Sequence, residues 1–305
     1  MRTRNIFLSA LGVAVLMALL PFLGVGGYVL GLLTSAFYFG VFAMGWDLLF
    51  GFAGEVNFGP SFLIGVGAYT AGLLNHYAHW PIVACVPLGA LAAVVAGLLL
   101  AVPALRLSGP YFGLVTLVAV LLLQNVIVIF AGFTGGEIGL DLPDVLAISS
   151  RVNYWYALGL ATVVGLALFA LSRSAVGLIL QASGQDAVEA AALGFNVVRH
   201  KLAAFCISAL VSGLAGAMLI FYLGTVSTDS VVDIAIGVQV IIAAVLGGRR
   251  TILGAAVGAV FLIVAGELLR PVGQLSSFIV SAVALLVILF FPGGLLGRVI
   301  VREGA

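Results

Sequence analysis

The sequence predicts an all-α fold, a polytopic membrane helix bundle of about ten transmembrane helices. Three observations predict it: the 305 residues are 64% hydrophobic, only 8% are charged, and the mean hydropathy is +1.33. Soluble domains carry about 25% charged residues, so a soluble fold would lack surface charge. The net charge of +1 leaves no basic surplus for nucleic acid. We therefore expect membrane lipid around the chain and no nucleic-acid partner.

The apolar runs give the predicted spans, since a bilayer core about 30 Å thick needs roughly 20 apolar residues per helix. Ten runs stand between polar or Gly/Pro breaks: 6–24, 28–50, 60–74, 82–103, 111–131, 154–172, 202–223, 232–247, 251–269 and 276–296. A different division of 6–50 or 232–269 would give nine. A cleaved signal peptide is the alternative for the first run, but no small-x-small cleavage site precedes a polar start, so we expect a retained helix.

The basic residues predict the topology, because Lys and Arg concentrate in cytoplasmic connections. With the N-terminus inside, the outside connections hold only Arg151 and Arg270. The inside connections hold the other ten basic residues: Arg2, Arg4, Arg106, Arg173, Arg199, Lys201, Arg249, Arg250, Arg298 and Arg302. This bias predicts that both termini are cytoplasmic.

Two short runs suggest internal symmetry. The third and eighth runs adjoin glycine-rich turns, Gly51–Gly59 and Gly247–Gly248. Interrupted helices at matching places in two halves are typical of repeats that face a substrate path. Five spans per half would make these repeats inverted, although the halves show no residue-by-residue similarity. Small residues such as Gly254 and Gly258 are read as sites of close helix packing.

The longest hydrophilic stretch, 173–201, is predicted to lie inside the cell. Ser183 and Asp186 have the spacing of a capping box, and Gly194 stands where a glycine would end the helix. We expect one small helix with an apolar stripe that includes Val188 and Ala191. The stripe fits either a helix lying on the membrane surface or a docking site for a cytoplasmic partner.

Acidic residues within apolar runs are expensive and usually face a cavity or a partner. Asp47 and Glu55 qualify, and Asn57 follows Glu55 closely. Either they line a translocation path, or they act as hydrogen-bonded braces or interfacial groups. Glu267 and Arg270 are spaced for an i, i+3 ion pair.

The chain offers no candidate residues for catalysis or for a nucleotide site. Lys201 is the only lysine and is not part of the Gly-Lys-Ser/Thr sequence that a P-loop requires. The three histidines are predicted on opposite membrane faces, so no nucleophile–His–carboxylate set can form. We expect no enzyme activity, no metal site and no cofactor in this chain.

Five blocks, taken in order, resemble the LivM-type permeases of bacterial branched-chain amino acid ABC transporters, over about residues 30–297. The blocks are 51–59 with 65–70, 105–112, 134–140, the segments 189–194, 201–205 and 212–217 taken together, and 291–295. In this chain Asp47, Glu55 and Asn57 replace residues that the family usually has, and the 173–201 segment is poorer in arginine.

The resemblance implies that residues 1–305 form a single permease domain, with a cytoplasmic coupling loop at 173–201, in the bacterial cytoplasmic (inner) membrane. The implied partners are a LivH-like second permease, two cytoplasmic ATPase subunits that bind ATP–Mg, and an extracytoplasmic substrate-binding protein. The implied ATPase-coupling residues are Ser183, Asp186, Glu189, Ala190, Ala191 and Gly194. The implied substrates are leucine, isoleucine and valine. Related permeases for urea, amides or aromatic acids, or an ion-coupled secondary transporter, are the alternatives.

Overall fold

The computed structural model describes residues 2–105, 111–272 and 282, and it places a helix at each of the nine predicted spans before residue 272. The tenth span, 276–296, and block 291–295 lie outside the described residues, as do residues 106–110 of block 105–112. The principal helices are α1 (Arg2–Leu19), α2 (Gly27–Asp47), α3 (Pro60–Ala78), α4 (Ile82–Ala104), α5 (Tyr111–Ile129), α7 (Ser150–Arg173), α10 (Val197–Leu223), α12 (Ile234–Gly247) and α13 (Leu253–Leu268).

Shorter elements connect these helices. They are η1 (Leu20–Leu23), the π-helical turn η2 (Leu48–Phe52), α6 (Ala131–Thr134), α8 (Ala175–Gln185), α9 (Ala187–Ala192), α11 (Thr228–Val231), η3 (Arg270–Val272), and the antiparallel strands β1 (Leu140–Asp141) and β2 (Thr225–Val226). The all-α membrane architecture is confirmed, because six of the described helices are long and apolar enough to cross a bilayer. The count of ten, the N-in/C-in topology and the inverted repeats stay predictions.

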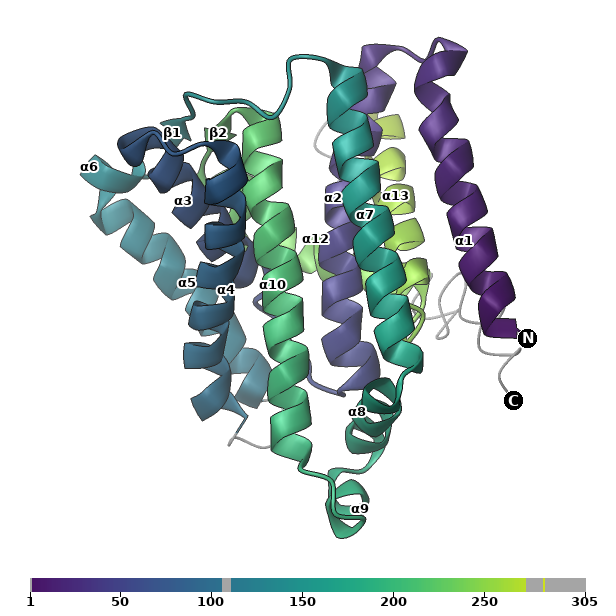
Figure 1. Cartoon of the computed structure of the whole chain (residues 1–305). Coiled ribbons are helices and arrows are strands. Elements are labelled where there is room, and N and C mark those ends of the chain that lie inside the picture. Colours follow the sequence, from purple (N-terminus) through teal and green to yellow (C-terminus); the bar gives the residue numbers. More distant parts are fainter. Residues whose placement is uncertain (1, 106–110, 273–281, 283–305) are drawn as a thin grey trace. The chain divides into compact units, whose positions relative to one another are not determined.

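The chain divides into two compact units (Figure 1), and the single permease domain stays a prediction. Unit 1 comprises Met1–Asp47, Ala147–Ala170 and Val240–Ala305, which bring α1, α2, most of α7 and α13 together. Unit 2 comprises Leu48–Leu146 and Leu171–Gln239, with α3, α4, α5 and α8 to α11.

In unit 1 the end of α1 is held against α7 by aromatic residues. The Tyr154 hydroxyl donates to the Met17 carbonyl at 2.8 Å, and the Trp155 indole N–H donates to the Ala18 carbonyl at 3.2 Å. Phe22, in the turn after α1, stacks at a tilt on Trp155 with ring centroids 5.6 Å apart. These bonds satisfy carbonyls that the helix end leaves without partners.

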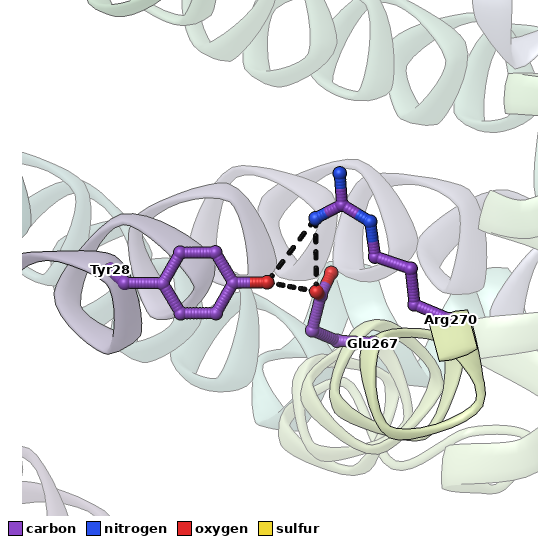
Figure 2. Close-up of polar contacts among 3 residues, drawn as sticks. All are labelled: Tyr28, Glu267 and Arg270. Atoms are coloured by element: carbon purple, nitrogen blue, oxygen red, sulfur yellow. Dashed lines mark hydrogen bonds and ion pairs between the residues drawn. The ribbon is translucent and has the colours of Figure 1, made fainter.

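The antiparallel helices α2 and α13 also pack together in unit 1. A Cβ on Gly40 would lie only 3.4 Å from the Cα of Ala256, so the two backbones approach closely. At one end of the pair, Figure 2 shows Tyr28 of α2 and Arg270 converging on the Glu267 carboxylate. The Glu267–Arg270 ion pair expected from the spacing is confirmed at 3.1 Å. Hydrogen bonds to Glu267 and Tyr28 raise the pKa of Arg270.

At the opposite end of this pair, Asp47 braces the turn that precedes α13. Its buried carboxylate accepts hydrogen bonds from the backbone N–H groups of Arg250 at 3.0 Å, Thr251 at 3.1 Å and Ile252 at 2.9 Å. Arg250 and Ile252 have positive φ, which is unfavourable for residues other than glycine. The carboxylate therefore stabilises a strained turn. Of the roles expected for Asp47, this contact is that of a hydrogen-bonded brace.

In unit 2 the three helices α3, α4 and α10 lie side by side around a crossing of glycines (Figure 1). A Cβ on Gly67 would lie 2.4 Å from the Cα of Gly213, and one on Gly89 would lie 2.4 Å from the Gly67 carbonyl oxygen. Real Cβ atoms do not tolerate such distances, so each position requires glycine. Close backbone approach replaces the hydrophobic drive that lipid cannot supply.

The expected short third helix is wrong, because α3 continues to Ala78, four residues past the predicted end at residue 74. The polar residue Asn75 suggested a loop, but its side chain is fully buried and satisfied. Its amide N–H donates to the Trp80 carbonyl at 3.0 Å and to the Asp144 carboxylate at 2.8 Å. The eighth helix α12 has only 14 residues, as expected, but with the short helix α11 before it the segment Thr228–Gly247 has 20 residues and is long enough to cross a bilayer.

Replacing Gly67 by valine should prevent stable packing of unit 2, because the crossing leaves no room for a side chain. Overpacking typically costs about 1–3 kcal/mol, and a clash with backbone is at or above the upper end. The control is Gly159→Val on α7, since Gly159 has open space around it. Thermal melting of the detergent-purified protein should show a large loss for the first variant only; equal melting curves would contradict the crossing.

Replacing Asp47 by alanine should destabilise the protein, because it leaves buried backbone N–H groups unpaired at about 1–3 kcal/mol each. Asp47→Asn should lie between alanine and wild type, because the amide keeps only one acceptor oxygen. Glu267→Gln, a half-buried position where the amide keeps an acceptor oxygen for Tyr28 and Arg270, serves as control and should melt nearly as the wild type does. A melting temperature unaffected by Asp47→Ala would show that the turn does not need the carboxylate.

Candidate functional site

The segment predicted to couple the chain to a partner forms two helices rather than one. Asp186 does not belong to a Ser183 capping box: its carboxylate itself caps α9 by accepting from Val188 N at 2.8 Å and Glu189 N at 3.0 Å. Ser183 lies inside α8 and is buried. The predicted capping box is therefore wrong. Asp186 does not end a box that Ser183 begins; it is the N-cap of a new helix, α9, a position that Asp often occupies.

Two further side-chain caps fix the segment, and the sequence reasoning missed both. Ser174 caps α8 through its hydroxyl, which accepts from Gly177 N at 3.4 Å, and Asn196 caps α10 by accepting from Arg199 N at 3.0 Å. Ser and Asn ahead of an apolar run are ordinary N-cap signals. The predicted stop at Gly194 is confirmed, since it follows α9 with φ of +88°.

The short helix α9 presents apolar side chains outward. Val188 is 79% exposed and Leu193, directly after the helix, is 74% exposed. Among the predicted coupling residues, those that are exposed are Asp186, Glu189, Ala191 and Gly194. Ala190 and Ser183 are buried and turn toward the protein. The segment thus has one buried side, which packs on the rest of unit 2, and one exposed apolar side. The exposed Leu193 was not among the predicted coupling residues.

The loop 53–59 between η2 and α3 packs against α8. A Cβ on Gly54 would lie 2.8 Å from the Gly184 carbonyl oxygen, and one on Gly184 would lie 2.5 Å from the Phe52 carbonyl oxygen. Gly54 also has φ of +74°, a conformation that favours glycine. The two backbones therefore touch directly, without side chains between them.

Glu55 in the same loop is paired with the only lysine of the chain. Its carboxylate lies 2.6 Å from the Lys201 ammonium group, and the two side chains are 20% and 15% exposed. Lys201 lies in the second turn of α10. The sequence prediction left Glu55 as path lining or brace, and this contact is a brace between the loop and α10.

Asn57 and Phe58 connect the loop to α3 and α5. The buried Asn57 side chain accepts a hydrogen bond from Gly59 N at 2.8 Å, directly before α3 begins. The Phe58 N–H donates to the Thr116 hydroxyl of α5 at 3.0 Å. The loop is therefore fixed at both ends and in its middle.

The predicted path residues are divided between the two units. Glu55 and Asn57 belong to unit 2, whereas Asp47 and its three backbone partners belong to unit 1. Near Asp47, burial and the neighbouring Arg249 lower the pKa of Arg250. Within the described ranges, no group of three or more His, Cys, Asp or Glu residues gathers as a metal site would require.

Known proteins place the chain in a family. The family model described as "branched-chain amino acid transport system / permease component" matches residues 28–292. The high-affinity branched-chain amino acid transport system permease protein LivM of Salmonella typhimurium is 30% identical, over 96% of this chain and 75% of its own length.

More distant relatives belong to the same group. The permease protein BraD of Pseudomonas aeruginosa is 26% identical over 87% of this chain and 94% of its own. The permease protein LivH of Salmonella typhimurium is 25% identical over 85% and 91%. No solved structure matches the chain. Since the family model spans most of the sequence and the LivM alignment nearly all of it, the chain belongs to the branched-chain amino acid transport permease family.

Proposed function

We propose that this chain is one membrane-spanning permease subunit of an ATP-driven importer for branched-chain amino acids in the bacterial cytoplasmic membrane. The observation that carries the proposal is the 30% identity with LivM along 96% of the chain. The apolar composition and the six helices that could span a bilayer support a multi-pass location. The prevalence of basic residues in the predicted inside connections supports cytoplasmic termini.

The partners follow from what a permease subunit lacks. A LivH-like second permease would complete the path, and an extracytoplasmic binding protein would deliver the substrate. Two cytoplasmic ATPase subunits would bind ATP–Mg and supply the energy, because Lys201 is the only lysine and forms no P-loop. The chain itself would then be a transport subunit and not an enzyme.

The outward side of α9 is the proposed docking site for an ATPase subunit. Val188 and Leu193 expose most of their apolar surface on a helix of six residues, an arrangement that fits a protein partner. Asp186, Glu189, Ala191 and Gly194 share this exposed surface, so they are the proposed contacts. The buried Ala190 and Ser183 would instead seat the segment on unit 2.

We assign Asp47, Glu55 and Asn57 structural roles beside the path rather than direct substrate contacts. Each of the three side chains binds a partner in its own unit. Asp47 and Asn57 accept hydrogen bonds from backbone N–H groups, and Glu55 forms an ion pair with the Lys201 ammonium group. Substrate selectivity would then reside chiefly in the binding protein.

The reconstituted importer tests the proposal. Proteoliposomes that contain this chain, the second permease and the ATPase subunits should accumulate labelled leucine, isoleucine or valine when binding protein and ATP are supplied. Liposomes with this chain alone should accumulate none. Uptake of urea or an aromatic acid in place of the amino acids would reassign the substrate, and accumulation without ATPase subunits would refute the importer.

Replacing Val188 by glutamate should weaken ATPase binding, because it places a charge in an apolar contact without disturbing the fold of an exposed position. Loss of a central apolar contact typically costs about 2 kcal/mol or more, so co-purified ATPase should fall by about tenfold or more. Ile138→Glu is the matched control, since Ile138 is 96% exposed in the loop before β1. Equal ATPase recovery with both variants would move the docking site away from α9.

A further inference from the structure

We propose that the Glu55–Lys201 ion pair acts as a strut, which transmits movement of the coupling segment α8–α9 to α3. This inference rests on the proposed function, because it assumes that an ATPase subunit moves α9. Glu55 and Lys201 are positioning residues in this account: neither needs to touch the substrate or the nucleotide.

The first link joins the coupling segment to the loop 53–59. The Gly54 and Gly184 backbones are in direct contact, so α8 cannot advance toward the loop without pushing it. Packed backbone is nearly incompressible, and a displacement at such a contact is passed on rather than absorbed. A backbone contact alone transmits compression but offers nothing to pull the loop back.

The ion pair supplies the missing return link. The 2.6 Å contact between Glu55 and Lys201 joins the loop to α10, which follows α9 after only Leu193–Asn196. Both side chains are mostly buried, at 20% and 15% exposure, so salt and water screen the pair less than an exposed pair. The loop thereby contacts α8 through backbone and α10 through the ion pair, so it follows movement of either helix.

The far end of the loop passes the movement to α3. Asn57 ties the loop to Gly59 immediately before Pro60, the first residue of α3. The hydrogen bond from Phe58 N to Thr116 ties the same place to α5. Because α3 packs on α4 and α10 through the glycine crossing, a displacement of its first turn changes the packing of the whole unit.

The complete importer in proteoliposomes tests the strut, with uptake and ATP hydrolysis measured on the same preparation. In Glu55→Gln and Lys201→Gln, the complex should assemble and hydrolyse ATP, while substrate taken up per ATP should fall by about twofold to thirtyfold, the span typical of mutations along coupling networks. The reversed pair, Glu55→Lys with Lys201→Glu, should restore much of this ratio. A residue that merely supports the fold would lower uptake and hydrolysis together.

The control is Glu267→Gln, which removes the Glu267–Arg270 ion pair in unit 1. Its ratio of uptake to hydrolysis should equal that of the wild type. An unchanged ratio in Glu55→Gln, an equal fall in Glu267→Gln, or failure of the reversed pair to recover above the single variants would overturn the strut. Loss of assembly in both the single variants and the reversed pair would also overturn it, since the pair would then hold the fold.

The wild-type measurement separates this inference from the proposed function. If the wild-type complex neither retains ATPase subunits nor takes up amino acid with ATP, the proposed function has failed. If the wild type couples normally and Glu55→Gln couples equally well, only the strut has failed.

Discussion

The constraint on which this structure depends is that every backbone polar group inside a bilayer needs a partner within the protein. Helices meet this demand along most of the chain, and each interruption of a helix creates a new demand. At two interruptions of the apolar helices, a side chain takes over. Asp47 binds the turn before α13, and Asn57 binds the backbone directly before α3. These residues are polar within an apolar sequence for a structural reason.

This principle explains how much the sequence could predict. Hydropathy locates the helices well, because a helix that crosses lipid must be apolar over a fixed length, and the nine described spans were found within a few residues. It fails at Asn75, whose polar side chain is buried and donates both to the nearby Trp80 carbonyl and to Asp144, 69 residues further along the chain. Such tertiary partners leave no local pattern. The same holds for the contact of Glu55 with a lysine 146 residues further along the chain.

The candidate site was predictable in location but not in its internal arrangement. The hydrophilic stretch 173–201 and its glycine stop located the connection that forms α8 and α9, while its coupling role stays a prediction. The helix break at Asp186 was missed because Ser183 and Asp186 fit two capping patterns equally, and only burial of Ser183 decides between them. Once the break is known, the exposed side of α9 follows, and so does the separation between residues that seat the segment and residues that face outward.

Unit 2 contains a continuous chain of contacts from this exposed helix to α3. It runs from α9 through α8, the glycine contact at Gly54 and Gly184, and the Glu55–Lys201 pair. Under the proposed function, this chain of contacts would connect the ATPase docking site on α9 to α3. Movement of α9 could pass along these packed contacts to α3 without crossing a loop that lacks contacts of its own.

Hydrogen–deuterium exchange of the assembled importer tests most directly the claim that a partner motor acts on this chain through α9. Adding the ATPase subunits should protect the backbone amides of residues 187–195, which end in exposed apolar side chains. A weaker change should follow in residues 53–59, behind α8. Protection confined to the loop around Ile138, with residues 187–195 exchanging as before, would contradict the account.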